Sequence, residues 1–139
     1  MNVNPSSAYK EARVRTAGQG QLIVMLYDEA IKQIDTALSA LDKKPRKLDA
    51  VHNALTRAQD IITELTASLD FDKGGEMAVN LFNLYMFFNH QLMEGNVRKE
   101  AAPLRMVRNF MEQIRRSWVQ IANTKVQPAS SSPGVNIAG

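Results

Sequence analysis

Apolar residues recur every three or four positions in four separate segments of the chain, and this spacing is the periodicity of an amphipathic helix. The β-branched alternation that is typical of strands is absent from all four segments. The second segment carries the regular series Leu48, Val51, Leu55, Ala58, Ile62, Leu65 and Leu69. The last segment repeats this spacing with Leu104, Val107, Met111, Ile114, Trp118 and Ile121. The pattern predicts four long helices, each with an apolar face.

Glycine and proline residues mark the joints between these segments, at residues 18–20, 42–47, 70–75 and 94–103. Helices of similar length joined by short connections pack antiparallel at shallow angles. We therefore predict an all-α antiparallel four-helix bundle, with room for a short extra helix and an N-terminal arm. Several residues suit the helix starts, namely Thr16 with Gln19 as a capping box, Pro45 and Pro103 in first turns, and Asp70 or Asp72 as an N-cap.

The 139 residues fit one domain with two flanking segments. Residues 1–17 are predicted to form an N-terminal arm, residues 18–126 the helical bundle, and the serine- and proline-rich residues 127–139 a disordered tail. The chain has no cysteine, which suits a reducing compartment. Its longest fully apolar run, residues 22–27, is far shorter than the ~20 residues that span a bilayer. We expect a cytoplasmic protein without membrane insertion.

The first predicted helix has a wide apolar face that accounts for most of its apolar residues. Its core seam consists of Ile23, Tyr27, Ala30, Ile34, Ala37 and Leu41, flanked by Leu26, Ile31 and Leu38. Met25 falls outside this face, among polar residues.

The third predicted helix has two apolar stripes about 120° apart. Its core side consists of Met77, Leu81, Leu84, Tyr85, Phe88 and Leu92, and the second stripe of Val79, Phe82, Met86 and Met93. One bundle seam cannot bury both stripes. Either this helix is packed on two sides, or the second stripe is a groove that accepts a helix of another chain. The two readings are compatible if the N-terminal arm, anchored by its one aromatic residue, Tyr9, covers the groove until a partner displaces it.

Residue patterns for catalysis, metal binding or cofactor binding are missing from the sequence. His52 and His90 fall at the edge or on the polar side of their helices, where they are interpreted as boundary or surface residues. The glycines at 18 and 20 follow no strand and lack the remaining glycines of a dinucleotide-binding motif. We therefore expect no enzyme activity, no catalytic residues, no metal site and no cofactor.

The charge distribution leaves a second class of function open. The net charge is +3, and residues 98–125 contain seven basic residues against two acidic ones. With the basic residues at 43–47, this gives the alternative that the chain is a basic helical bundle that binds nucleic acid. The aromatic residues lie mostly on apolar faces and cannot stack with bases beside those charges. The favoured partner is therefore a protein and not a nucleic acid.

Several motifs resemble, in order and spacing, the FliS family of flagellar secretion chaperones. They are TAGQGQLIVMLYDEAI at residues 16–31, RAQDIITELTASLDFDKGGEMAVNLFNLYMF at 57–87, and RRSW at 115–118. The resemblance covers Tyr9 to about Ile121. Glu29 stands where the family usually has glycine, which puts contacts carried over to that position in doubt.

The resemblance implies an antiparallel helical bundle that binds newly made flagellin in the cytoplasm. By this analogy the chain holds the disordered C-terminal segment of flagellin, prevents its premature polymerisation and helps deliver it to the export gate protein FlhA. The N-terminal arm with Tyr9 would be displaceable, and the chain would be a monomer or an arm-swapped dimer. We expect the flagellin-binding groove to contain Met25, Tyr27, Ile31, Val79, Phe82, Met86 and Met93.

Overall fold

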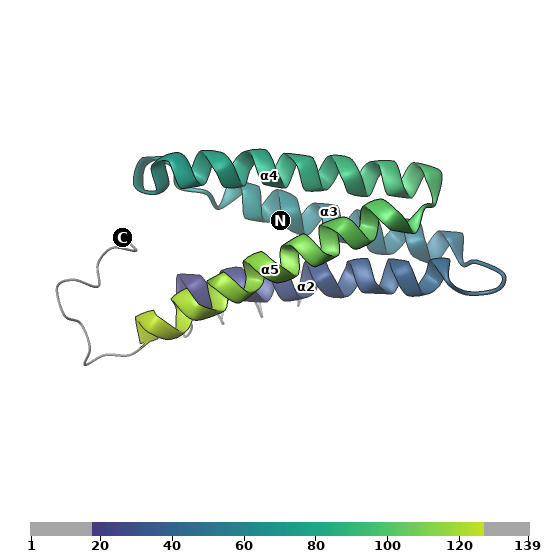
Figure 1. Cartoon of the computed structure of the whole chain (residues 1–139), viewed down its shortest axis with the longest axis horizontal. Coiled ribbons are helices and arrows are strands. Elements are labelled where there is room, and N and C mark those ends of the chain that lie inside the picture. Colours follow the sequence, from purple (N-terminus) through teal and green to yellow (C-terminus); the bar gives the residue numbers. More distant parts are fainter. Residues whose placement is uncertain (1–17, 127–139) are drawn as a thin grey trace, which may run out of the picture.

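Four helices form an antiparallel bundle, as predicted, in the computed structural model of the chain (Figure 1). The structure describes residues 18–126, with side chains as far as Thr124. The helices are α2 (Gln19–Leu41), α3 (Leu48–Ala67), α4 (Phe71–Arg98) and α5 (Ala101–Val126). Both α2 and α4 pack against α3 and α5, so α2 and α4 lie on opposite sides of the bundle (Figure 1). The predictions for residues 1–17 and 127–139, including Tyr9, lie outside the described residues.

The core follows the predicted apolar seams. On α2, Tyr27, Ala30, Ile34 and Ala37 are fully buried, and they meet fully buried residues of the three other helices. The largest fully buried side chains outside α2 include Tyr85, Phe88, Leu55, Ile62, Leu65, Leu92, Leu104 and Met111. Among the described residues, every buried side chain of the core is apolar or aromatic. Hydrophobic burial along four seams therefore holds the bundle together.

Two residues that the sequence placed in the core are exposed. Met77 is 63% exposed because α4 begins at an end of the bundle from which α5 has turned away toward α2 (Figure 1). Leu48 is 42% exposed because it is the first residue of α3, beside the connecting loop. In both cases the residue lies on the apolar face that the helical periodicity predicts. It is exposed because none of the described helices covers that end of the face.

Capping and backbone geometry explain where α4 begins. The Asp70 side chain accepts hydrogen bonds from the backbone N–H groups of Asp72 and Lys73 at 3.1 and 3.0 Å, which confirms Asp70 as the N-cap. Gly75 then adopts φ 54° and ψ −127°. This backbone conformation interrupts the helix, and residues other than glycine rarely adopt it. The regular part of α4, which carries the exposed apolar residues, starts after this kink.

The remaining predictions of helix ends had mixed results. Pro103 lies in the first turn of α5, as predicted, whereas Pro45 lies in the loop before α3 and not in its first turn. The N-cap of α2 is Gly18, and no side chain of the described residues forms a capping hydrogen bond there. Thr16 of the predicted capping box lies outside the described residues. The broad joint predicted at residues 94–103 contracts to Lys99 and Glu100, because α4 stays helical through Arg98.

Candidate functional site

The predicted second stripe of α4 is exposed along the length of the helix. Val79, Phe82, Met86 and Met93 are 47%, 37%, 54% and 45% exposed, and the row continues to Val97, which is 77% exposed. These five residues are called the outer stripe. The opposite side of α4 is buried against α3 and α5, so the described helices leave the outer stripe uncovered. A row of this length is a surface on which an amphipathic segment can lie.

An aromatic contact widens the outer stripe at its N-terminal end. The rings of Phe71 and Phe82 meet edge to face with centroids 6.2 Å apart, and Phe71 is itself 48% exposed. This contact holds the Phe82 ring in place while part of each ring still faces solvent. Phe71 belongs to the segment before the Gly75 kink, so the kink joins two parts of one apolar surface.

A second apolar surface lies along the seam of α4 and α5, and the sequence analysis missed most of it. Phe110 and Met106 of α5 are 39% and 38% exposed, and Phe87 of α4 is 40% exposed. The rings of Phe87 and Phe110 both pack on the buried ring of Phe88, with centroid distances of 6.4 and 5.4 Å. The spacing of four between Met106 and Phe110 is the signal that could have identified this surface.

The three predicted site residues of α2 are not brought together with those of α4. Tyr27 is fully buried, Ile31 is 7% exposed and Met25 is half-buried, and α2 lies on the other side of the bundle from the outer stripe. Tyr27 and Ile31 are therefore core residues, since their apolar groups already pack against other helices. Their place in the expected groove is not supported by their burial.

Tyr27 instead forms a buried polar contact across the bundle. Its hydroxyl lies 2.8 Å from the hydroxyl of Tyr85, and the two ring centroids are 6.4 Å apart. Burial raises the pKa of Tyr27 far above its ordinary value, and the neighbouring Tyr85 raises it further. Burial also raises the pKa of Tyr85. Both phenols are therefore neutral at physiological pH, and the pair fixes the register of α2 against α4.

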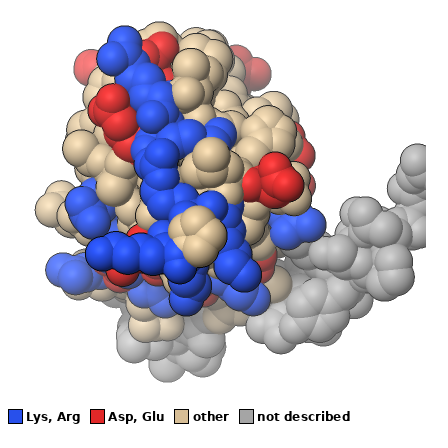
Figure 2. All heavy atoms as spheres, turned by 90° about the vertical axis from the view of Figure 1, so that its right-hand side faces the viewer, with Lys and Arg blue, Asp and Glu red and all other residues tan. Residues whose placement is uncertain are grey.

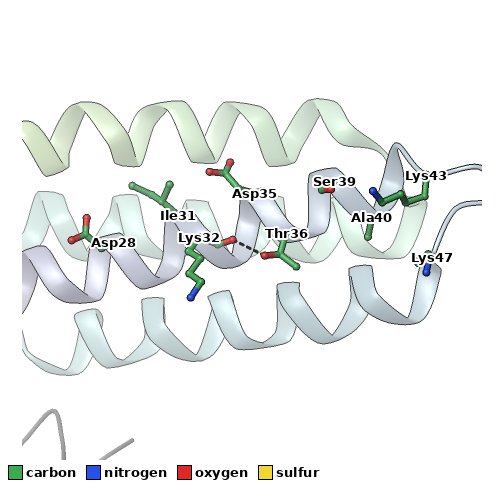
Figure 3. Close-up of a pocket in the computed structure, with 9 residues that line it drawn as sticks. All are labelled: Asp28, Ile31, Lys32, Asp35, Thr36, Ser39, Ala40, Lys43 and Lys47. Atoms are coloured by element: carbon green, nitrogen blue, oxygen red, sulfur yellow. Dashed lines mark hydrogen bonds between the residues drawn. The ribbon is translucent and has the colours of Figure 1, made fainter.

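A shallow trough of about 640 Å³ runs along the outer face of α2 (Figure 3). It is lined by Asp28, Ile31, Lys32, Asp35, Thr36, Ser39, Ala40, Lys43 and Lys47. Two arginines of α5 reach its acidic residues, since Arg115 pairs with Asp28 and Arg108 Nε donates to Asp35 at 3.0 Å. These pairs engage two arginines on which the nucleic-acid alternative rested. The trough is open and lined mostly by charged or polar residues, but the surface that these residues present is largely apolar.

The described residues offer little else for chemistry. Among residues 18–124 there is no group of three or more His, Cys, Asp or Glu side chains arranged to hold a metal ion. His52 is exposed, and its Nδ1 lies 3.0 Å from Asn96 Nδ2 at the surface between α3 and α4. None of the four helices is long and apolar enough to cross a membrane.

Comparison with known proteins places the chain in a family. The family model described as flagellar protein FliS matches residues 2–125. The flagellar secretion chaperone FliS of Salmonella typhimurium is 35% identical over 113 residues, which cover 81% of this chain and 82% of the relative. The flagellar secretion chaperone FliS of Bacillus subtilis is 26% identical over 132 residues, which cover 95% and 96% of the two chains. The chain therefore belongs to the FliS family of flagellar secretion chaperones.

Proposed function

We propose that this chain is a cytoplasmic export chaperone that binds the disordered C-terminal segment of flagellin on the outer stripe of α4. The observation that carries this proposal is the row of exposed apolar side chains from Val79 to Val97, in which the polar His90 stands between Met86 and Met93. An amphipathic segment with apolar residues at helical spacing matches such a row. The family relationship supports a flagellar substrate.

The size of the exposed groups fits this role. An aromatic side chain carries about 200 Å², so the 37% of Phe82 that is exposed offers about 75 Å² to a partner. Covering that area at about 25 cal/mol per Å² contributes about 2 kcal/mol. Ordering a disordered segment costs roughly 2 to 5 kcal/mol, so several such residues must act together. The outer stripe and Phe71 supply six.

A matched pair of double variants tests the site. Phe82→Ala with Met86→Ala removes one phenylalanine and one methionine from the outer stripe, and Met106→Ala with Phe110→Ala removes the same two types from the seam of α4 and α5. The exposed fractions of the two phenylalanines are 37% and 39%, so the loss of apolar area there is similar. Calorimetry with the C-terminal segment of flagellin should show affinity at least about tenfold weaker for the first variant. The second variant should stay within about threefold of the parent chain.

Circular dichroism of both variants separates binding from folding. If Phe82→Ala with Met86→Ala loses its helical signal, the outer stripe is part of the core and the proposed site is wrong. Equal affinity losses in two folded variants would also contradict the assignment to the outer stripe.

The N-terminal arm extends this proposal. Residues 1–17, with Tyr9 as the anchor, cover the apolar surface in the free chain and give way to flagellin; by exchange between two chains, the arm can also form a dimer. Deleting residues 1–12 should then increase the binding of a dye that reports apolar surface. Unchanged dye binding by the folded, shortened chain would refute this role of the arm.

The later steps are prevention of polymerisation and delivery to FlhA. Flagellin bound through its C-terminal segment should not add to a filament, so the chain should inhibit seeded polymerisation of flagellin in proportion to its concentration. The complex with flagellin should also bind the soluble part of FlhA more tightly than the chain alone does. Equal binding of FlhA by the free and the loaded chain would argue against delivery.

A further inference from the structure

Basic residues gather at the end of the bundle formed by the loop between α2 and α3 and by the junction of α4 with α5. Residues 42–47 and 98–100 together contain six basic residues and two acidic ones. The two segments are in contact, since Arg46 Nη1 donates to the backbone oxygen of Lys99 at 3.1 Å. Figure 2 shows Lys and Arg side chains in a band across this face. This cluster, called the basic end, consists of Lys43, Lys44, Arg46, Lys47, Arg98 and Lys99.

Internal contacts of the described residues occupy only part of this charge. Arg98 Nε pairs with Glu94 at 3.2 Å, and Lys99 Nζ donates to the backbone and side-chain oxygens of Asn96. The side chains of Lys43, Lys44 and Lys47 are exposed and have no hydrogen bond or ion pair with any described residue. The C-terminal dipole of α2 favours nearby positive charge but needs no more than one or two such residues. The remaining positive charge is available to an anionic ligand.

The outer stripe leads directly to the basic end. Val97, its last and most exposed residue, immediately precedes Arg98 on α4. The stripe extends over the 19 residues from Val79 to Val97, and the 18 steps between them span about 27 Å along the helix at about 1.5 Å per residue. On the other side of the basic end, Leu48 follows Lys47 and is 42% exposed. A ligand on the outer stripe that extends past Val97 therefore reaches Arg98 first, and the contact of Arg46 with Lys99 connects this side of the basic end to Lys43 and Lys47 beside the α2 trough.

We propose that the basic end binds acidic residues that flank the amphipathic segment of the bound protein. This inference rests on the proposed function of the outer stripe and adds the charge and the direction of its ligand. The apolar face of the segment would run from Val79 to Val97, and its acidic flank would cross the end of the bundle from Arg98 past Arg46 toward Lys43 and Lys47. Such a charge match places the ligand in one orientation, because its acidic flank is attracted to one end of α4.

Aromatic placement favours a peptide over a nucleic acid or a lipid surface. Base stacking and anchoring at a membrane interface both use aromatic side chains beside the basic residues. In the described part of the chain, Tyr27 and Tyr85 are buried, and Phe87 and Phe110 pack on Phe88 at the seam of α4 and α5. The apolar residues next to the basic end are the aliphatic Val97 and Leu48.

The test uses three synthetic peptides that share one amphipathic 18-residue helix, a length chosen to match the outer stripe of about 27 Å. One peptide carries four glutamates at its N-terminus, one carries them at its C-terminus, and one carries four glutamines. Fluorescence anisotropy with the full chain should show that one glutamate peptide binds at least about tenfold more tightly than the glutamine peptide at about 50 mM salt. This preference should shrink to about twofold or less at about 500 mM salt, because salt screens exposed charges.

Two double charge reversals locate the preference. Lys43→Glu with Lys47→Glu alters the basic end, and Arg57→Glu with Lys73→Glu makes the same change of net charge elsewhere on exposed positions. Only the first variant should lose the preference for glutamate. Equal binding of all three peptides, or a preference that survives in the first variant, would overturn the proposal.

Other outcomes separate this inference from the proposed function. If the glutamine peptide does not bind but a glutamate peptide binds in the manner just described, the basic end is supported and the outer stripe is not the helix site. If no peptide binds, the proposal for the basic end fails, whereas the proposed function is decided by the calorimetry with the C-terminal segment of flagellin. Binding of duplex DNA or of phosphatidylglycerol vesicles that exceeds peptide binding, and that Lys43→Glu with Lys47→Glu removes, would replace the peptide with that ligand.

Discussion

The buried pair of Tyr27 and Tyr85 hydroxyls gives a sharp test of the bundle. Their oxygens lie 2.8 Å apart, and both residues are almost completely buried. Tyr27→Phe removes one hydroxyl and leaves the other without this partner inside the core. A buried polar group left unsatisfied costs about 1 to 3 kcal/mol, so each single variant should lose about 2 kcal/mol of unfolding free energy. For a domain of this size that loss lowers Tm by roughly 8 °C.

The double variant shows whether the two hydroxyls bond to each other. Tyr27→Phe with Tyr85→Phe removes both hydroxyls, so neither phenol is left without its partner, and the loss is limited to the net value of the hydrogen bond between them, about 1 kcal/mol, and of the contact of Tyr27 with Trp118. The two single losses should therefore sum to more than the double loss by at least about 1 kcal/mol. Urea unfolding followed by circular dichroism measures all four chains. Additive losses would refute the account, because they would mean that each hydroxyl has an independent partner.

Three further outcomes follow from the same structure. Burial raises the pKa of both phenols, so their stabilisation is complete below about pH 10 and is lost as the pH rises from there toward the folded pKa. The urea midpoint should therefore fall more steeply above about pH 10 in the parent chain than in Tyr27→Phe with Tyr85→Phe, and parallel profiles would contradict this. Asp70→Ala should lower the unfolding free energy by about 1 kcal/mol in urea titrations, since it removes the cap of α4; an unchanged midpoint would mean that water replaces the cap. Gly75→Ala should lower Tm by several degrees because of its positive φ, and by more than Gly18→Ala, which meets open space at an extended backbone and loses only the preference for glycine over alanine at an N-cap; equal effects would show that the kink tolerates a side chain.

Helical periodicity was sufficient to predict most of this fold. The spacing of apolar residues on α2 and α3 predicted the buried positions Tyr27, Ile34, Val51 and Leu55, because one seam of a bundle buries one stripe of each helix. The same reasoning found the outer stripe as an excess on α4. It failed at Met77, because the direction of α5, which turns away from the start of α4 and leaves this part of the seam uncovered, is a tertiary property.

The candidate site was predictable only in part. A helical wheel assigns residues to the faces of one helix, so it separated Val79 and Met86 from the buried face of α4. It does not say which helices lie side by side, and for that reason Tyr27 and Ile31 were grouped with α4 residues from which the bundle separates them. The basic end also depends on tertiary structure, since Arg46 and Lys99 are 53 positions apart and meet only after folding.

A cysteine footprint tests the central claim most directly, because the chain contains no cysteine of its own. Met86→Cys places a thiol on the outer stripe, and Asp60→Cys places one on an exposed position of α3. The rate at which a maleimide modifies each thiol is measured with and without a saturating C-terminal segment of flagellin. We predict that modification at position 86 slows at least about tenfold while the rate at position 60 is unchanged, as for a group that the ligand covers. An unchanged rate at position 86 in the saturated complex would contradict binding on the outer stripe.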